Sequence, residues 1–412
     1  MDGTGPGDTG TEYPSGHLIV TGDRISAIGS GPVPAPDLNL DLDLDRAVTI
    51  DGRGCLATPG LVNTHHHLYQ WLTQGRAQQQ GLFGWLTELY PVWTRIDPGA
   101  VAAAATAGLA WLALSGCSTS TDHHYMFPRR LTGSAAAEVL AAEIAAARRV
   151  GLRFHPCRGS MDLGESRGGL PPDDAVEDTG AALAATEAAI AAHHDPSPGA
   201  MLRIAVGPCS PFTATPELMR ESAALARATG TRLHTHLAET ADEDDYCRER
   251  TGRSPAEFIE DLGWLGPDVW LAHCVHLDDA AIGRLAATGT GVAHCPSSNA
   301  RLGAGIAPVR CLLAAGVPVG LGVDGPASSE GARLAGEIRQ ALLSARSRGT
   351  DGAAALTARQ ALWLATRGGA RCLGRDDEIG ALRPGALADV ALWRLDTLAH
   401  DAIAQGPGGD PV

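Results

Sequence analysis

Lysine is absent from this 412-residue sequence, so all 32 of its basic side chains are arginine. No apolar run reaches about eighteen residues, which excludes an α-helical membrane span. The opening residues, MDGTGPGDTG, contain neither a basic nor an apolar region and do not resemble a secretory signal. The nine cysteines form no CxxC pair and their number is odd, which argues against a disulfide framework. We therefore expect a cytoplasmic protein with reduced thiols.

The sequence also has little positive charge. Its formal net charge is −15, which argues against binding to a phosphate backbone as its main activity. With 44% hydrophobic and 19% charged residues, the chain has the composition of a soluble globular protein that is long enough for a barrel-sized domain and a small satellite. We expect a small-molecule substrate, no nucleic-acid or membrane partner, and leave a homo-oligomer open.

Short apolar runs alternate with Ala- and Leu-rich helical stretches from residue 58 to about residue 350. The strand candidates occupy residues 60–67, 117–124, 152–159, 202–208, 232–239, 269–274, 290–296 and 317–324. Eight strand–helix repeats are typical of a (β/α)₈ barrel of the TIM type, and polar residues end nearly every strand, where such barrels place their active sites. An open, doubly wound sheet is the alternative, but it would not need so many strands ending in histidine.

The two ends of the chain differ in composition from the middle. Short β-type runs at residues 17–20, 24–29 and 47–52 predict a small sheet, and the tail at residues 378–396 is expected to return to it. The alternating segment DLNLDLDLD, residues 37–45, predicts an edge strand or a solvated loop. We therefore divide the chain into residues 1–57 and 366–412, two parts of one small β-domain with a shortened second part, around a barrel of residues 58–365.

The segment TPGLVNTHHH ends an apolar run in three consecutive histidines. Side chains two apart on an extended chain point the same way, so His65 and His67 can converge on one ion. Imidazole is the commonest neutral ligand of zinc and related ions. An isolated HxH pair would more often be two polar residues that close a strand, but similar groups recur downstream.

Later predicted strands also finish in histidines and carboxylates. HTHLAE supplies His234 and His236, with Glu239 three residues on; VWLAHCVH supplies His273 and His276; and GLGVDG places Asp324 before a glycine. A catalytic zinc ion needs about four N, S or O ligands and a position for water, whose pKa it lowers toward neutrality. A nearby carboxylate can move the proton. One barrel mouth would therefore hold a metal-dependent hydrolytic site.

The blocks PGLVNTHHH, HTHLAET, WLAHCVHL and GLGVDG, in this order, resemble the motifs of the amidohydrolase superfamily in its mononuclear deaminase branch. The resemblance implies a distorted (β/α)₈ barrel with a small β-sandwich made from both chain ends. It implies Glu239 as the proton shuttle, His273 as the residue that orients the attacking hydroxide, and the metal ligands His65, His67, His236 and Asp324. Binuclear members bridge two metals with a carboxylated lysine, so a chain without lysine is expected to bind one divalent ion, zinc or alternatively iron.

The segments NTHHHLYQ, LFGWLTELYPVW, STSTDHHYMFP and AHCPSSNARLGAGIAPV are similar to those of the 8-oxoguanine deaminases. This similarity implies hydrolysis of the exocyclic amine of 8-oxoguanine to urate and ammonia, with Asp324 taking the proton of the water and passing it to the amine. Isoxanthopterin deaminases and triazine hydrolases are similar relatives, so another purine or pterin, or an amino- or chlorotriazine, is the alternative substrate. A catalytically dead barrel with a structural role is a further alternative, although no expected ligand is missing.

Substrate contacts are expected from Gln70, His124 and Arg158. Gln70 carries an amide that can pair with a purine edge, or it caps the following helix. One of His123 and His124 is expected to face the cavity, with a structural histidine as the alternative. Arg158 either binds substrate or braces its loop through an ion pair with Glu165.

We expect mainly structural roles for the other residues near the motifs. Trp71 and Trp85 can stack on a ring, but large aromatic side chains are more often part of a core. His66 is expected outside the metal shell and His234 deeper in the barrel than His236. Residues 297–299, in the segment PSSN, are expected to cap a turn, with a direct substrate contact as the alternative.

Overall fold

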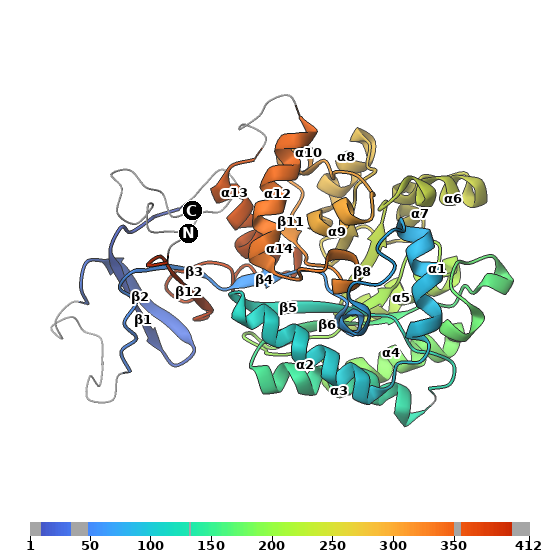
Figure 1. Cartoon of the computed structure of the whole chain (residues 1–412), viewed down its shortest axis with the longest axis horizontal. Coiled ribbons are helices and arrows are strands. Elements are labelled where there is room, and N and C mark those ends of the chain that lie inside the picture. Colours follow the sequence, from blue (N-terminus) through green and yellow to red (C-terminus); the bar gives the residue numbers. More distant parts are fainter. Residues whose placement is uncertain (1–9, 34–47, 132, 350–355, 398–412) are drawn as a thin grey trace.

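The computed structural model describes residues 10–33, 48–131, 133–349 and 356–397, and its main body is a closed barrel of eight parallel strands (Figure 1). Around the barrel the strands follow the order β10, β11, β4, β5, β6, β7, β8 and β9. Their bounds are β4 Leu61–Asn63, β5 Cys117–His124, β6 Arg153–Ser160, β7 Ala205–Pro208, β8 Arg232–Leu237, β9 Val269–His273, β10 Gly291–His294 and β11 Val319–Leu321. The barrel prediction is confirmed, and the open sheet is excluded because β11 pairs with β4.

Helices follow the strands and surround the barrel (Figure 1). Several begin where an Asp or Thr side chain accepts a hydrogen bond from a backbone N–H of the first turn, as Asp97, Thr215 and Asp278 do. The helices are α1 Leu82–Trp93, α2 Pro98–Leu114, α3 Ser134–Val150, α4 Thr179–His193, α5 Pro216–Thr229, α6 Ala241–Thr251, α7 Pro255–Asp261, α8 Asp279–Thr288, α9 Pro296–Arg301, α10 Val309–Ala314, α11 Pro326–Ser329, α12 Leu334–Arg348, α13 Ala358–Trp363 and α14 Gly369–Cys372. Within the described residues, no helix has both the length and the apolar character needed to cross a membrane.

Two small antiparallel sheets lie beside the barrel, at the left of Figure 1. One pairs β1 (Gly16–Thr21) with β2 (Arg24–Ser30), and the other pairs β3 (Cys55–Pro59) with β12 (Val390–Arg394). The C-terminal segment therefore reaches the N-terminal one, and a bridge between Arg24 and Leu387 adds a second link. The domain boundaries at residues 57 and 365 stay predictions.

One strand near the N-terminus was placed wrongly by the sequence pattern. Residues 48–52, most of the run AVTIDG, have no regular structure, and Val48 and Ile50 are exposed. The strand instead begins at Cys55, after the turn that Gly54 makes with a φ of 73°. Apolar β-branched residues favour strands only when a partner strand covers them. The segment DLNLDLDLD lies outside the described residues.

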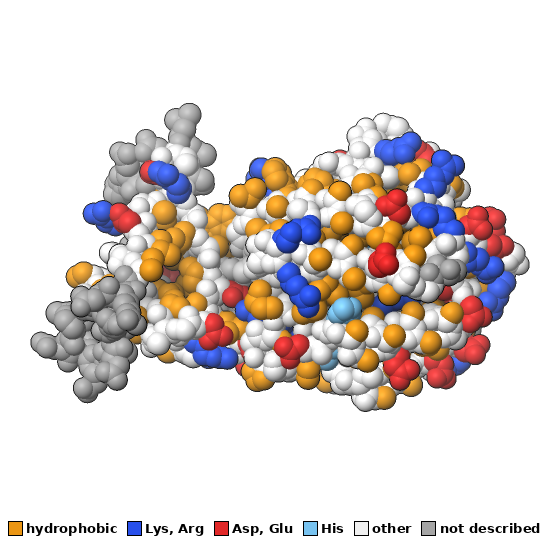
Figure 2. Space-filling view, turned by 90° about the horizontal axis from the view of Figure 1, so that it is seen from below, with side chains coloured by type: hydrophobic (Ala, Val, Ile, Leu, Met, Phe, Trp, Pro, Cys, Tyr) orange, Lys and Arg blue, Asp and Glu red, His pale blue; other side chains and the backbone are white. Residues whose placement is uncertain are grey.

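The apolar core lies between the barrel strands and the helices, with Leu233, Leu271 and Val319 among its fully buried members. A second cluster collects side chains of α1, including Trp85 and Trp93, with residues that follow the strands. On the face in Figure 2, apolar side chains are scattered over the barrel, and acidic and basic side chains are most frequent at the end away from the small sheets. The second cluster covers the carboxyl ends of the strands, where the polar residues predicted for the site lie.

Candidate metal centre and active site

Three imidazoles and one carboxylate meet at the carboxyl ends of three barrel strands. His65 and His67 follow β4, His236 lies on β8, and Asp324 follows β11. The Nε2 atom of His67 lies 3.1 Å from Nε2 of His236, and Oδ1 of Asp324 lies 3.4 Å from Nε2 of His65 and 3.3 Å from Nε2 of His67. Ligands about 2.1 Å from a tetrahedral metal ion are about 3.4 Å apart. The four side chains therefore have the spacing of one metal shell.

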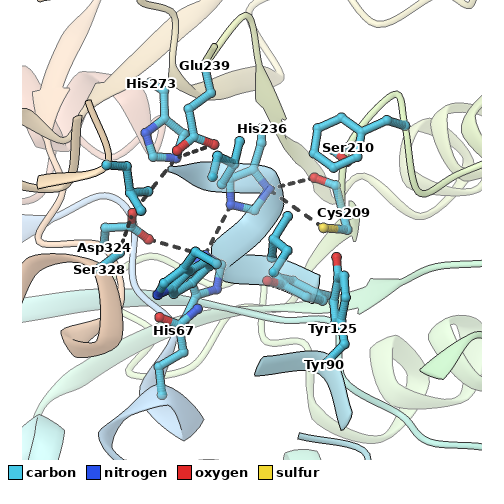
Figure 3. Close-up of a pocket in the computed structure, with 16 residues that line it drawn as sticks. His67, Tyr90, Tyr125, Cys209, Ser210, His236, Glu239, His273, Asp324 and Ser328 are labelled. Carbon is cyan, nitrogen blue, oxygen red and sulfur yellow. Dashed lines mark hydrogen bonds and ion pairs between the residues drawn. The ribbon is translucent and has the colours of Figure 1, made fainter. Parts of the chain in front are cut away.

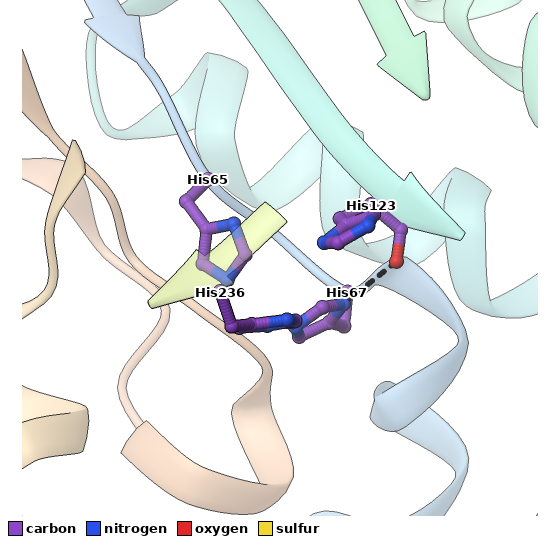
Figure 4. A group of neighbouring side chains, drawn as sticks. All are labelled: His65, His67, His123 and His236. Carbon is purple, nitrogen blue, oxygen red and sulfur yellow. Dashed lines mark hydrogen bonds between the residues drawn. The ribbon is translucent and has the colours of Figure 1, made fainter. Parts of the chain in front are cut away.

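Backbone carbonyl groups orient two of these imidazoles. His67 donates its Nδ1–H to the backbone oxygen of His123 at 2.8 Å (Figure 4), and His236 donates its Nδ1–H to that of Cys209 at 2.6 Å (Figure 3). A carbonyl only accepts, so the proton of each neutral ring is on Nδ1 and the lone pair is on Nε2. Both lone pairs thus face the shared position before any metal arrives.

His65 is oriented by another histidine, His234. The Nδ1–H of His234 donates to the backbone oxygen of Trp270 at 2.8 Å, so its Nε2 is an acceptor, and Nδ1 of His65 lies 2.7 Å from it. His65 therefore also presents a lone pair on Nε2, a buried atom without a hydrogen-bond partner in the structure. The HTH spacing placed His234 on the same side as His236, but its bond to His65 depends on how β8 and β4 face each other across the barrel.

The protonation states of this group fit a divalent cation. Burial lowers the pKa of His67 to about 4 and holds those of His65 and His236 well below the usual range, so the rings are neutral near pH 7. Burial would raise the pKa of Asp324, but its contact with Nε2 of His65, 3.4 Å away, and the nearby imidazoles of His273 and His67 keep that pKa well below the ordinary value. The group can thus supply three neutral nitrogens and one anionic oxygen, which suit zinc or a similar ion.

His123 is the fourth imidazole of this cluster. It lies beside His65, His67 and His236, with one nitrogen from each ring within 4.8 Å of the others (Figure 4). The Nε2–H of His123 donates to the backbone oxygen of Gly207 at 2.8 Å, and the ring stacks on His236. The predicted ligand set contains Asp324 instead of His123, and we propose that His123 packs the cluster.

Glu239 follows β8, His273 ends β9, and both face the metal position. Nε2 of His273 lies 3.6 Å from Oε2 of Glu239 and 4.0 Å from Oδ2 of Asp324 (Figure 3). Burial raises the pKa of Glu239 to about 7. Burial also lowers the pKa of His273, but the two carboxylates outweigh it and the net shift is upward. A carboxyl group that exchanges its proton near pH 7 and an imidazole whose protonated form is favoured therefore lie beside the ligand set.

The backbone turns sharply at these same strand ends. Ala238, His273 and Asp324 have φ values of 50°, 71° and 56°, in the left-handed region that residues other than glycine rarely occupy. Such conformations persist when the surrounding structure over-determines them, and they cluster at functional sites. Here they redirect the chain so that neighbouring side chains point into the barrel mouth.

A pocket opens over the metal position, and α1 forms one of its walls (Figure 3). Its lining includes the four site residues His67, His236, Glu239 and His273, together with Asp324, Gln70, Trp85, Leu86, Tyr90, Tyr125, Cys209, Ser210, Phe212 and Ser328. The amide of Gln70 packs against Gly325, where an added Cβ would lie 1.7 Å from Oε1. That oxygen is buried without a partner in the structure, so it can meet a donor on a ligand.

His124 and Arg158 lie outside this pocket. His124 points out of the barrel, where Nδ1 lies 2.7 Å from Oε1 of Glu143 and Nε2 lies 3.0 Å from the backbone oxygen of Met126. Alternation along β5 sends His123 inward and His124 outward. The structure therefore does not bring His124 to the substrate and gives it a structural role.

Arg158 braces its loop, but with a different partner from the one the sequence favoured. Its guanidinium donates to both carboxylate oxygens of Glu177, at 2.7 and 2.8 Å, and lies 3.7 Å from the ring centre of Phe127. Glu165 instead lies on an exposed turn. Glu177 is nineteen residues from Arg158, and local sequence gave no sign of the pair.

The other residues near the motifs also have defined places. His66 is buried outside the ligand set, and its Nδ1 accepts the backbone N–H of His67 at 2.7 Å. Trp85 lines the pocket, whereas Trp71 packs against Trp111. Residues 297–299 belong to α9, and Oδ1 of Asn299 accepts the Nδ1–H of His273 at 2.9 Å.

Comparison with known proteins places this geometry in a family. A model described as "Amidohydrolase family" matches residues 56–409. An 8-oxoguanine deaminase from Pseudomonas aeruginosa is 45% identical over 401 residues, covering 96% of this chain and 86% of that protein. An isoxanthopterin deaminase from an unknown prokaryotic organism is 38% identical, covering 99% of this chain and 87% of that protein.

Solved structures give the same result for the fold. The crystal structure of an atrazine chlorohydrolase from Arthrobacter aurescens TC1, complexed with zinc, superposes with a TM-score of 0.84 at 36% identity. The match covers 93% of this chain and 83% of that one. A zinc-bound relative with this fold supports a divalent metal at the cluster described above.

Proposed function

Because this chain belongs to the amidohydrolase family and is a hydrolase of carbon–nitrogen bonds, we propose that it deaminates an oxidised purine, 8-oxoguanine, with one zinc ion. The observation that carries this proposal is the site itself: a four-ligand set beside Glu239, a carboxyl group whose pKa of about 7 suits proton transfer. The identity of 45% to an 8-oxoguanine deaminase over nearly the whole chain supports the substrate.

His65, His67, His236 and Asp324 would hold the cation, which lowers the pKa of a water molecule toward neutrality and polarises it. Asp324 is anionic and accepts a proton from the attacking water. Glu239, in its protonated form, donates to the ring nitrogen beside the amine-bearing carbon. His273 in its imidazolium form, which the neighbouring carboxylates of Glu239 and Asp324 favour, donates a hydrogen bond from its Nε2–H to the attacking oxygen and stabilises the charge that develops there.

The second half of the reaction expels the amine. The carbon–nitrogen bond breaks as Asp324 passes its proton to the leaving nitrogen, and the hydroxyl oxygen on the carbon becomes a carbonyl as its proton returns to Glu239. One 8-oxoguanine and one water thus give one urate and one ammonia. Closure by α1 excludes bulk water, which strengthens each electrostatic contact in the site.

The pocket wall supports a flat, polar ring as the substrate. Trp85, Leu86 and Phe212 provide apolar surface, and Tyr125 and Gln70 provide polar groups at its edge. Aromatic and aliphatic walls suit the faces of a purine, while the buried oxygen of Gln70 suits a ring N–H.

A second candidate is a pterin or a triazine. The isoxanthopterin deaminase covers 99% of this chain, and the zinc-bound atrazine chlorohydrolase superposes with a TM-score of 0.84. These rings share a planar shape and a carbon attached to a leaving group. They differ from 8-oxoguanine in size and in the hydrogen bonds of their edges.

Ammonia release from 8-oxoguanine, guanine, isoxanthopterin and melamine tests the proposal. We expect the highest kcat/KM with 8-oxoguanine, urate as the product, and loss of turnover after chelation with recovery on adding zinc. The matched inactive control is Asp324→Asn. No turnover of 8-oxoguanine by the zinc-loaded protein would reject this substrate, and turnover of another ring in the panel would replace it.

A further inference from the structure

The side chain of Asn299 forms a hydrogen bond with His273 at Nδ1, the ring nitrogen that points away from the site. Oδ1 of Asn299 accepts the Nδ1–H of the imidazole at 2.9 Å, and both side chains are buried, at 1% exposure. The opposite nitrogen, Nε2, faces Glu239 and Asp324. The imidazole is thus fixed at one nitrogen and presents the other to the site.

The surroundings of the Asn299 amide agree with its oxygen being the atom that faces His273. Its Nδ2 group is buried without a hydrogen-bond partner in the structure, and Asn299 also lines a cavity of about 200 Å³ with His294 and Ser344. Both ring nitrogens of His294 are buried there without partners and offer an acceptor. The amide oxygen lies 2.9 Å from Nδ1 of His273 and can only accept, which assigns the proton of a neutral His273 to Nδ1.

The backbone around Asn299 restricts the position of its side chain. Its N–H donates to the carbonyl oxygen of Cys295 at 3.0 Å, and its own carbonyl oxygen accepts from the N–H of Ala304 at 2.9 Å. The preceding turn is fixed from another element, since the N–H of Ser297 donates to Oε2 of Glu337 on α12 at 3.0 Å. Helix α9 thus presents Asn299 to His273 from a fixed backbone.

We propose that Asn299 is a positioning residue for the deamination: its side-chain oxygen fixes the ring orientation and tautomer of His273, so that Nε2 meets the attacking oxygen. This inference rests on the proposed function of the site. It assigns a role to the segment PSSN, which the sequence alone suggested as a turn cap or a direct substrate contact. Asn299 acts through His273 and does not line the pocket.

Substitutions of similar size separate the hydrogen bond from packing. Asn299→Leu removes the acceptor and Asn299→Asp keeps it, while Ala300→Ser changes an exposed neighbour on the same helix. We expect Asn299→Leu to lower kcat roughly 10- to 100-fold, as loss of orienting partners does. KM should stay within about threefold and the zinc content unchanged, because Asn299 contacts neither substrate nor ligand. Asn299→Asp should recover most of the activity, and Ala300→Ser should match the parent protein.

The tautomer itself provides a test that needs no turnover. In zinc-loaded protein with ¹⁵N-labelled histidine, at a pH high enough for His273 to be neutral, the His273 signals, identified by their loss in a His273→Gln variant, should show a proton on Nδ1 and none on Nε2. Asn299→Leu should remove this preference. A His273 protonated only at Nε2 in the parent protein, or an unchanged spectrum in Asn299→Leu, would overturn the proposal. If no substrate of the panel is turned over, the proposed function fails, and the spectrum still decides the role of Asn299.

Discussion

Replacing Glu239 with glutamine should remove the proton donor while leaving the shape of the pocket intact. Glu239 is buried and its pKa is raised from the ordinary 4.5 to about 7. Roughly half of these groups carry a proton at pH 7, against about 0.3% at the ordinary pKa, so burial makes the donor about 150-fold more available. Proton transfer by a positioned side chain contributes roughly 100- to 10,000-fold to a rate. We expect kcat of Glu239→Gln to fall within that range.

Steady-state ammonia release with the chosen substrate measures this loss, with metal content determined on the same samples. In the parent protein the activity should fall as the pH rises through about 7, because Glu239 acts in its protonated form and loses its proton there. Glu143→Gln is a matched control, since Glu143 is also buried with a raised pKa, of about 8, but lies outside the pocket. A fully metal-loaded Glu239→Gln enzyme that kept more than about a tenth of the parent kcat would refute this role.

Three further outcomes follow from the same contacts. His234→Leu removes the acceptor of the Nδ1–H of His65 and should weaken zinc binding roughly 10- to 100-fold in a chelator competition; unchanged affinity would contradict this role. Gly325→Ala places a methyl group 1.7 Å from the Gln70 oxygen and should raise KM at full metal content. The same change in a Gln70→Ala background should have little effect on KM. Equal effects in both backgrounds would show that the two side chains do not interact. Burial lowers the pKa of His66 to about 3, so as the pH falls through 6.5 this side chain is protonated in the unfolded chain before it is protonated in the folded one. Acid therefore destabilises the parent protein through His66. Between pH 7 and pH 5 the free energy of unfolding should fall about 2 kcal/mol less in His66→Gln than in the parent protein. Denaturant titrations at both pH values measure that difference, and equal losses would mean that His66 is protonated in the folded state.

Periodicity and motif order predicted the barrel well. Residues 117–124 were predicted as a strand and form β5 with those bounds, since the segment begins and ends at a clear change of residue type. Residues 48–52 were predicted wrongly, because the apolar residues Val48 and Ile50 satisfy strand propensity without a partner strand to cover them.

For the candidate site, the sequence predicted which residues end the strands, but it did not predict the hydrogen bonds that orient those residues. Spacing was enough to suggest that His65 and His67 converge, since alternation is a local property. The contacts of His234 with His65 and of Asn299 with His273 join residues 169 and 26 positions apart, and no local pattern encodes them. Arg158 illustrates the same limit: its loop position suggested bracing, but tertiary packing selected Glu177.

The pairing of β11 with β4 joins the first and last strands of the barrel. The two histidines after β4 and the aspartate after β11 therefore lie on opposite sides of the closing seam, where Asp324 also bridges to His66 through the backbone. During synthesis, three imidazoles emerge long before the carboxylate that completes the set. An ion bound by all four groups links the beginning of the barrel to its end, so metal loading and ring closure should stabilise each other.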